Sequence, residues 1–147
     1  MKPLCVVSCP IDTFSGYGAR SRDFVKALFK VKGEEWDIKI MPQRWGECPW
    51  NFLDDNDSLR QHFIGNLDPN NQPDVWIQIT VPNEFSPVGK YNIGISAGIE
   101  TTIYKAEFIE VSNRMDFNLV LLSIFVMLKR VAGSQFSNKE FMFSINL

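Results

Sequence analysis

The chain has 147 residues, and its 45% hydrophobic and 22% charged content is typical of one folded domain rather than of a disordered segment. A formal net charge of −2 argues against broad nucleic-acid binding, because that requires an excess of Lys and Arg over the acids. The longest apolar stretch, residues 117–128, is shorter than the roughly 20 residues that cross a bilayer, and no leader-like segment opens the chain. We therefore expect a cytoplasmic protein.

The first half of the chain predicts two strands and two helices. The apolar run 4–8 predicts a buried strand, and residues 36–41 alternate apolar and polar as a second strand does. Between them, residues 19–30 place apolar side chains on one helical face and basic ones on a face that we expect to be solvated. The acidic stretch 54–58 predicts the cap of a short helix at 59–64. The basic residues of the first helix are Arg20, Arg22, Lys26 and Lys30.

The second half continues the alternation of strands and helices. Strands are predicted at 75–80, 91–96 and 117–122, with a helix at 103–115 before the last of them. This order predicts an α/β fold, with an open, mostly parallel sheet and flanking helices in a single Rossmann-like domain. We place that domain at residues 1–122, and we treat residues 123–147 as an atypical tail without clear periodicity.

Three loops follow the carboxyl ends of predicted strands, where open parallel sheets collect their ligands. They span residues 10–18, 81–90 and 97–102. In the first, Gly16-Tyr17-Gly18 opens a helix, so its backbone N–H groups could face an anion. The dinucleotide fingerprint is incomplete there, because about seven residues separate the strand from the first glycine and the second strand ends without an acid. A flexible turn explains the glycine pair equally well.

Three acidic positions are candidates for chemistry. Glu100 follows a glycine directly after the fourth predicted strand, where its carboxylate could orient or deprotonate a hydroxyl or, alternatively, cap the next helix. Glu84 lies in a comparable loop and is expected to be a surface acid. The stretch Asp55-Asn56-Asp57 has a form that binds cations in other folds, but it precedes a predicted helix. We interpret it as a helix cap and predict no metal site.

Cys5, Cys9 and His62 are expected to be structural. Cys5 and Cys9 lie four residues apart on one side of the first strand and read as buried small hydrophobes. Cys48 forms no C-x-x-C pair with either of them. His62 is the only histidine, and we expect a surface or half-buried ring.

Five motifs in chain order resemble the N-terminal half of GT-B glycosyltransferases of the group 1 type. The resemblance covers roughly residues 4–122. The motifs are Ser15-Gly16-Tyr17-Gly18-x-x-Ser21-Arg22, Pro73-Asp74-Val75-Trp76, Pro82-Asn83-Glu84-Phe85, Ala97-Gly98-Ile99-Glu100-Thr101-Thr102 and Asn113-Arg114-Met115-Asp116.

The resemblance implies two Rossmann-like domains that face a cleft. The N-terminal domain would take the acceptor and the C-terminal one the nucleotide-sugar, which is the donor substrate, with no cofactor and no strictly required metal. Gly16, Tyr17 and Gly18 would line the donor phosphates, and Glu100 would be the catalytic candidate. The other residues implied on the acceptor side are Arg22, Asn83, Glu84, Gly98 and Thr101.

The resemblance stops near Leu122. The family continues with Pro-Ser and a further helix, whereas residues 123–147 do not. We therefore expect a truncated or frame-shifted product, inactive alone, whose partner is a missing C-terminal domain or a separate donor-binding subunit. The basic helix face could touch a diphosphate or an anionic membrane surface.

Two further functions stay open. One is a non-catalytic Rossmann-like module that binds a ligand or a partner subunit, and the other is a small nucleotide-dependent oxidoreductase. The donor sugar, the acceptor and the stereochemical outcome are not defined by the sequence.

Overall fold

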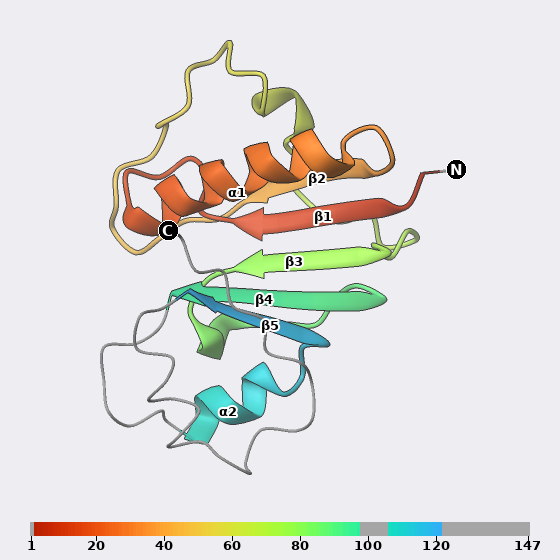
Figure 1. The fold of residues 1–147 in the computed structure, drawn as a ribbon. Helices are drawn as coiled ribbons and strands as arrows, with labels where there is room; N and C mark the ends of the chain where they lie inside the picture. The colour runs from red at the N-terminus through yellow and green to blue at the C-terminus, as the bar shows by residue number, and fades with distance from the viewer. Residues whose placement is uncertain (1, 98–105, 122–147) are drawn as a thin grey trace.

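The computed structural model describes residues 2–97 and 106–121, which fold around one parallel β-sheet with helices on both sides (Figure 1). The strands are β1 (Leu4–Cys9), β2 (Asp37–Pro42), β3 (Val75–Ile79), β4 (Tyr91–Ala97) and β5 (Phe117–Leu121). The helices are α1 (Gly16–Lys32) and α2 (Ala106–Ser112), with single 3-10 turns at η1 (Arg60–His62) and η2 (Pro82–Glu84).

The strands lie in the order β2-β1-β3-β4-β5, and each neighbouring pair is parallel. The predicted α/β class and parallel sheet are therefore confirmed. After β1 the chain goes to one side of that strand to form β2, and it then returns to the other side to form β3. Such a reversal is a topological switch point, and doubly wound α/β proteins of this strand order bind ligands outside the carboxyl ends of the strands there.

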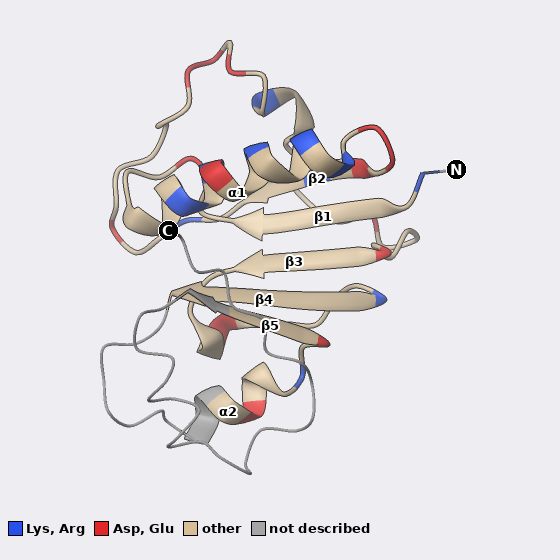
Figure 2. Cartoon of the chain, in the orientation of Figure 1, with Lys and Arg blue, Asp and Glu red and all other residues tan. Residues whose placement is uncertain are grey.

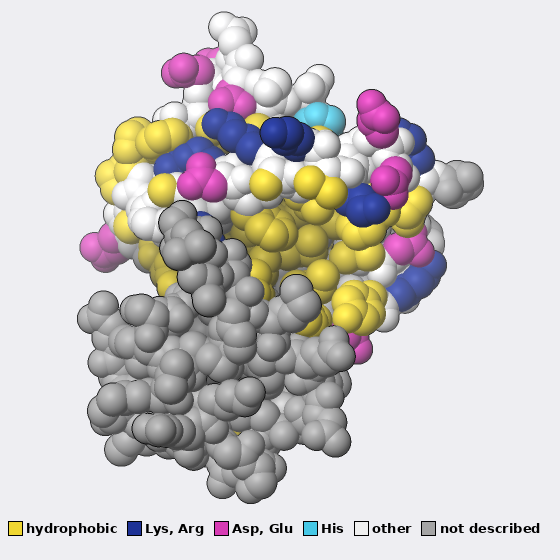
Figure 3. Space-filling model, in the orientation of Figure 1, with side chains coloured by type: hydrophobic (Ala, Val, Ile, Leu, Met, Phe, Trp, Pro, Cys, Tyr) yellow, Lys and Arg dark blue, Asp and Glu magenta, His cyan; other side chains and the backbone are white. Residues whose placement is uncertain are grey.

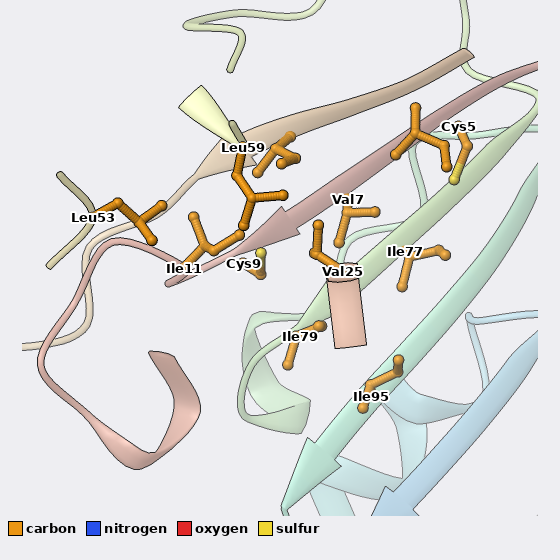
Figure 4. Close-up of a cluster of buried hydrophobic side chains, with 12 residues drawn as sticks. Cys5, Val7, Cys9, Ile11, Val25, Leu53, Leu59, Ile77, Ile79 and Ile95 are labelled. Carbon is orange, nitrogen blue, oxygen red and sulfur yellow. The ribbon is translucent and has the colours of Figure 1, made fainter. Parts of the chain in front are cut away.

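One face of the sheet, which we call the aliphatic face, packs against α1. Figure 4 shows Val25 of this helix among the buried side chains of that face. Alternate residues of each strand point to it, because side chains in a strand alternate between the two faces. Val25 of α1 is fully buried against them, and Leu28 and Phe29 pack at the margin. The strand residues of this face include Cys5, Val7, Cys9, Ile38, Ile40, Ile77, Ile79 and Ile95.

The opposite face, which we call the mixed face, carries η2 and α2. Its amino half is mainly apolar, with Val6 and Trp76 packed against Phe85 and Met115, and it also holds the buried Asn92 beside Trp76. Its carboxyl half is polar and nevertheless buried; the side chains there are Ser8, Gln78, Thr80, Ser96 and Asn118.

Gly94 lets the η2 connection lie directly on β4. A Cβ atom at this position would come within 2.7 Å of the Phe85 ring and 2.8 Å of the Asn118 side-chain oxygen. Real Cβ contacts are almost never that short, so the absence of a side chain is what allows the aromatic ring to cover the strand.

Two predicted helices differ from the structure at their ends. Helix α1 begins at Gly16 rather than at residue 19, because Ser15 is its N-cap and accepts a hydrogen bond from Gly18 N–H at 2.9 Å. The predicted helix at 59–64 is only the 3-10 turn η1. The expected cap is wrong as well, because the Asp57 carboxylate instead accepts from Leu59 N–H in a local turn.

The remaining boundaries agree within a residue or two, apart from the 103–115 helix. Its described part ends at Ser112, and residues 113–115 form turns. Residues 103–105, Leu122 and the tail lie outside the described residues. Within the described ranges, none of the helices is long and apolar enough to cross a membrane.

Candidate functional site

Tyr17 brings two of the three predicted loops together at the carboxyl edge of the sheet. It stands in the first turn of α1, and its phenolic oxygen accepts a hydrogen bond from Ala97 N–H at 3.0 Å. The same oxygen lies 3.3 Å from the Ser96 hydroxyl. The β1–α1 loop is thereby tied to the end of β4, across the end of β3, so the expected meeting of these loops at one edge is confirmed for their described residues.

Trp45, from the segment that follows β2, stacks on the Tyr17 ring. Their ring centroids are 4.1 Å apart, and the planes differ by 27°. Trp45 is a site residue that the sequence alone does not indicate. The only signal was the high aromatic content of the chain, because nothing local to Trp45 indicates that it meets a helix some thirty residues earlier.

The two glycines of the glycine loop differ in the space that surrounds them. A Cβ on Gly18 would lie 2.3 Å from the Thr13 carbonyl oxygen, so this glycine allows α1 to pack against its own preceding loop. A Cβ on Gly16 would meet no atom within 4 Å. Ser15 engages the N–H groups of Gly18 and Ala19, which leaves those of Gly16 and Tyr17 without a partner among the described residues.

Arg22 is not on a solvated face, and that part of the prediction is wrong. Only 8% of Arg22 is exposed, and its Nη1 donates to the carbonyl oxygens of Ile11 at 2.8 Å and Thr13 at 3.0 Å. Its guanidinium carbon lies 3.5 Å from the centre of the Phe52 ring. Burial lowers the pKa of Arg22, while Asp23 and Asp12 oppose that shift. Arg22 therefore holds the β1–α1 loop in shape.

The other basic residues of α1 are more accessible. Lys26 and Lys30 are exposed, as predicted, and Arg20 is half-buried. Figure 2 shows that an acidic position interrupts the basic ones along this helix. The surface of α1 is therefore mixed in charge.

The segment after β2 runs beside the β1–α1 loop and is fastened to it. Phe14 N–H donates to the Pro49 carbonyl, and Phe52 N–H donates to the Asp12 carbonyl, each at 3.0 Å. The buried Asp12 carboxylate accepts from Leu53 N–H at 2.8 Å and lies 3.3 Å from Arg60 Nη2. Two loops that are far apart in sequence are thus joined into one rim beside α1.

The η2 loop carries two of the predicted acceptor-side residues. Hydrogen bonds from β3 hold it in place. Gln78 donates to the Glu84 carbonyl oxygen and accepts from Ser86 N–H, both at 2.9 Å. The exposed Glu84 carboxylate accepts a hydrogen bond from the Thr80 hydroxyl, and Asn83 is exposed. Glu84 is therefore a surface acid, as predicted.

The other predicted acceptor-side positions are not placed by the structure. Gly98, Glu100 and Thr101 lie outside the described residues. From the third loop, only its first residue, Ala97, is described.

Cys5 and Cys9 are buried and His62 is half-buried, as predicted. Burial raises the pKa of both the Cys5 and Cys9 thiols to about 12, so neither forms a reactive thiolate near neutral pH. His62 is half-buried, with its ring 4.4 Å from that of Phe29. Among residues 2–97 and 106–121, no group of three or more His, Cys, Asp or Glu side chains could hold a metal ion.

No family model, curated protein or solved structure matches this chain. The structure itself defines an α/β protein with a candidate ligand site at the switch point of its sheet. That site is formed by the start of α1, the aromatic pair Tyr17 and Trp45, and the end of β4.

Proposed function

We propose that this chain is the acceptor-side domain of a glycosyltransferase, which transfers a sugar from a nucleotide-sugar to an acceptor. The observation that carries the proposal is the start of α1 at the switch point, with the N–H groups of Gly16 and Tyr17 left for a ligand. The proposal includes a Rossmann-like, GT-B type of fold, and the parallel sheet with helices on both sides supports it.

The electrostatics at the start of α1 favour an anionic group such as a diphosphate. The aligned peptide dipoles of a helix place partial positive charge at its N-terminus, and α1 has no acidic residue in its first turn. Open space at Gly16 lets a phosphate approach the backbone closely. The start of α1 therefore suits the donor diphosphate that the glycine loop would contact in the related family.

A division of labour follows from the resemblance in the five motifs. Glu100 would act on the acceptor as the catalytic residue, and Asn83 and Glu84 would lie on the acceptor side with Gly98 and Thr101. A second domain, in the same polypeptide or in a partner subunit, would bind the rest of the nucleotide-sugar. Catalysis would then need both domains.

Binding of uridine diphosphate, followed by amide chemical shifts, tests the proposal. We expect shifts centred on Gly16 and Tyr17. Gly16→Asp should weaken binding about tenfold or more, because the added carboxylate repels the diphosphate. The matched control is Gly65→Asp, which also adds a carboxylate where a Cβ meets no atom within 4 Å, and it should bind as the wild type does.

Three results would count against the proposal. Shifts that avoid the start of α1 would place nucleotide binding elsewhere. An equal loss of affinity for uridine diphosphate in the Gly16→Asp and Gly65→Asp variants would mean that only the net charge of the protein matters. Inorganic phosphate that binds as tightly as uridine diphosphate would show a simple anion site.

A second candidate is a non-catalytic interaction module, and the exposed aromatic rings favour it. Phe14 and Phe52 are 54% and 42% exposed, and their rings pack edge to face 4.9 Å apart. Exposed aromatic side chains are common at protein interfaces. Size-exclusion chromatography that shows a well-behaved monomer without a partner would count against a self-associating module.

A further inference from the structure

A surface cleft of about 390 Å³ lies beside the first turns of α1, on the side where the segment after β2 runs past the helix. Figure 3 shows hydrophobic, basic and acidic side chains gathered around the start of this helix. The cleft is lined by Ala19, Arg22, Asp23 and Lys26 of α1 and by Phe52, Leu53, Asp54 and Asp57 of the segment.

The wall opposite α1 is held in place before any ligand binds. Arg60 donates from Nη2 to the Leu53 carbonyl oxygen at 2.6 Å and from Nε to the Asp54 carbonyl oxygen at 3.0 Å. Phe52 and Leu53 are hydrogen-bonded to Asp12 through their N–H groups. A wall that is fixed in this way reduces the ordering that binding would otherwise require.

Arg22 lines the cleft and has hydrogen-bond donors that no described residue uses. The residue is more than nine-tenths buried and lines the cleft. Its Nη1 serves the Ile11 and Thr13 carbonyls, but its Nε and Nη2 have no partner among the described residues. A guanidinium has five donors in a fixed plane, so the remaining ones can bind adjacent oxygen atoms of a ligand.

The lining charges have both signs. Arg22 and Lys26 are cationic, whereas Asp23, Asp54 and Asp57 are anionic, and Asp57 already accepts from Leu59 N–H.

The charge of a ligand for this cleft is limited by these residues. The carboxylates would repel a polyanion, and the two bases would repel a polycation. A neutral ligand rich in hydroxyl groups fits better, because each hydroxyl donates to a carboxylate and accepts from a base. Phe52 supplies an exposed apolar surface beside these groups.

We propose that this cleft binds a neutral sugar ring. The identification of that sugar as the acceptor rests on the proposed function, but the binding itself does not. Vicinal hydroxyls of the ring would bind the free Arg22 donors and the Asp54 carboxylate, and Lys26 would donate to a further oxygen. The C–H surface of the ring would lie on Phe52.

Titration with the methyl glycosides of common hexoses and N-acetylhexosamines, followed by amide chemical shifts, tests the proposal. At least one glycoside should shift the resonances of Lys26 and Asp54. Asp54→Ala and Lys26→Met should each weaken its binding about tenfold, which is the effect of losing a hydrogen bond to a charged group. The matched controls are Asp55→Ala and Lys30→Met, which change exposed residues outside the cleft and should bind as the wild type does.

The site variants alter exposed side chains that have no hydrogen-bonded or ionic partner among the described residues, so they should keep the wild-type amide spectrum. The proposal is overturned if no glycoside shifts these resonances at millimolar concentration. Equal weakening in the control variants, or a cleft that responds to inorganic phosphate and not to glycosides, would also overturn it.

The two proposals fail separately. Glycoside binding without uridine diphosphate binding at Gly16 would leave a sugar site in a protein of another function. Uridine diphosphate binding without glycoside binding would keep the proposed function and exclude this cleft.

Discussion

The two faces of the sheet are built in different ways. On the aliphatic face, side chains such as Ile77 and Ile79 pack against α1, and the contacts there are apolar. On the mixed face, Gln78 and Asn92 use their amides to hold the backbone of the connections between strands. The aliphatic face therefore supplies most of the hydrophobic burial, and the mixed face holds the β3–β4 connection in shape.

This difference shows where the candidate site obtains its geometry. The start of α1 is positioned because the helix is packed on the aliphatic face, while η2 is positioned by hydrogen bonds from the mixed face. Hydrophobic burial depends on area and is non-directional, whereas a hydrogen bond is directional. Substitutions on the two faces should therefore affect different properties.

The largest effect is expected from Ile77→Ala. Ile77 is 2% exposed in the middle of the aliphatic face, and truncation of such a residue lowers the free energy of unfolding by about 2–5 kcal/mol. Chemical denaturation measures the loss. The control Val31→Ala removes an apolar side chain that is 68% exposed, and it should change the free energy by no more than about 0.5 kcal/mol. Similar effects for the two variants would contradict the assignment of the main core to this face.

A smaller and more local effect is expected from Gln78→Met, at the next position along β3. Methionine fills a similar volume but leaves the Glu84 carbonyl and Ser86 N–H without their partner. This change should lower the free energy of unfolding by about 1–3 kcal/mol. Hydrogen exchange should accelerate at Ser86 N–H more than in β1.

The control for that substitution is Gln72→Met. Gln72 also donates to a backbone carbonyl of the same connection, that of Val88, but it is exposed. Water can replace its hydrogen bond, so Gln72→Met should lower the free energy of unfolding only slightly. If exchange at Ser86 is unchanged in Gln78→Met, the mixed face does not hold the η2 loop.

The strands and the carboxyl-edge loops were predictable because their signals are local. An apolar run such as residues 4–8 gives a buried strand wherever it pairs, and parallel strands bring their following loops to one edge. The sequence predicts the start of α1 three residues too late, because Gly16 and Gly18 indicate a turn, whereas Ser15 caps a helix that includes both.

The partners across the site were not predictable from the sequence. Trp45 reaches Tyr17, and Phe52 reaches Arg22, through contacts between distant segments. The helical pattern places Arg22 on the polar side of α1, but it contains no information about a loop that later covers that side. The cleft arises from this covering, so its position required the tertiary structure.

The smallest effect is expected from Asp74→Asn. Asp74 is half-buried and, like Gln78, holds a neighbouring segment by side-chain hydrogen bonds. The Asp74 carboxylate accepts from Lys90 Nζ at 2.7 Å and from Leu4 N–H at 2.8 Å, and these bonds lower its pKa below the ordinary value, the one with Lys90 more. A lowered pKa in the folded state stabilises the protein fully above the ordinary Asp range, near pH 4, and the stabilisation is lost as the pH falls through the folded pKa.

Denaturation midpoints measured across a pH series check this dependence. The denaturation midpoint of the wild type should exceed that of Asp74→Asn by a constant margin at neutral pH. The two midpoints should converge as the pH falls below about 4. Asp55→Asn, at an exposed carboxylate with no such partner among the described residues, should follow the wild-type profile. Because Asp74 is solvent-accessible, salt should shrink the neutral-pH margin, whereas it should leave the loss in Gln78→Met unchanged. A margin that persists undiminished at low pH would mean that the Asp74 charge does not hold β1 to the β3–β4 connection.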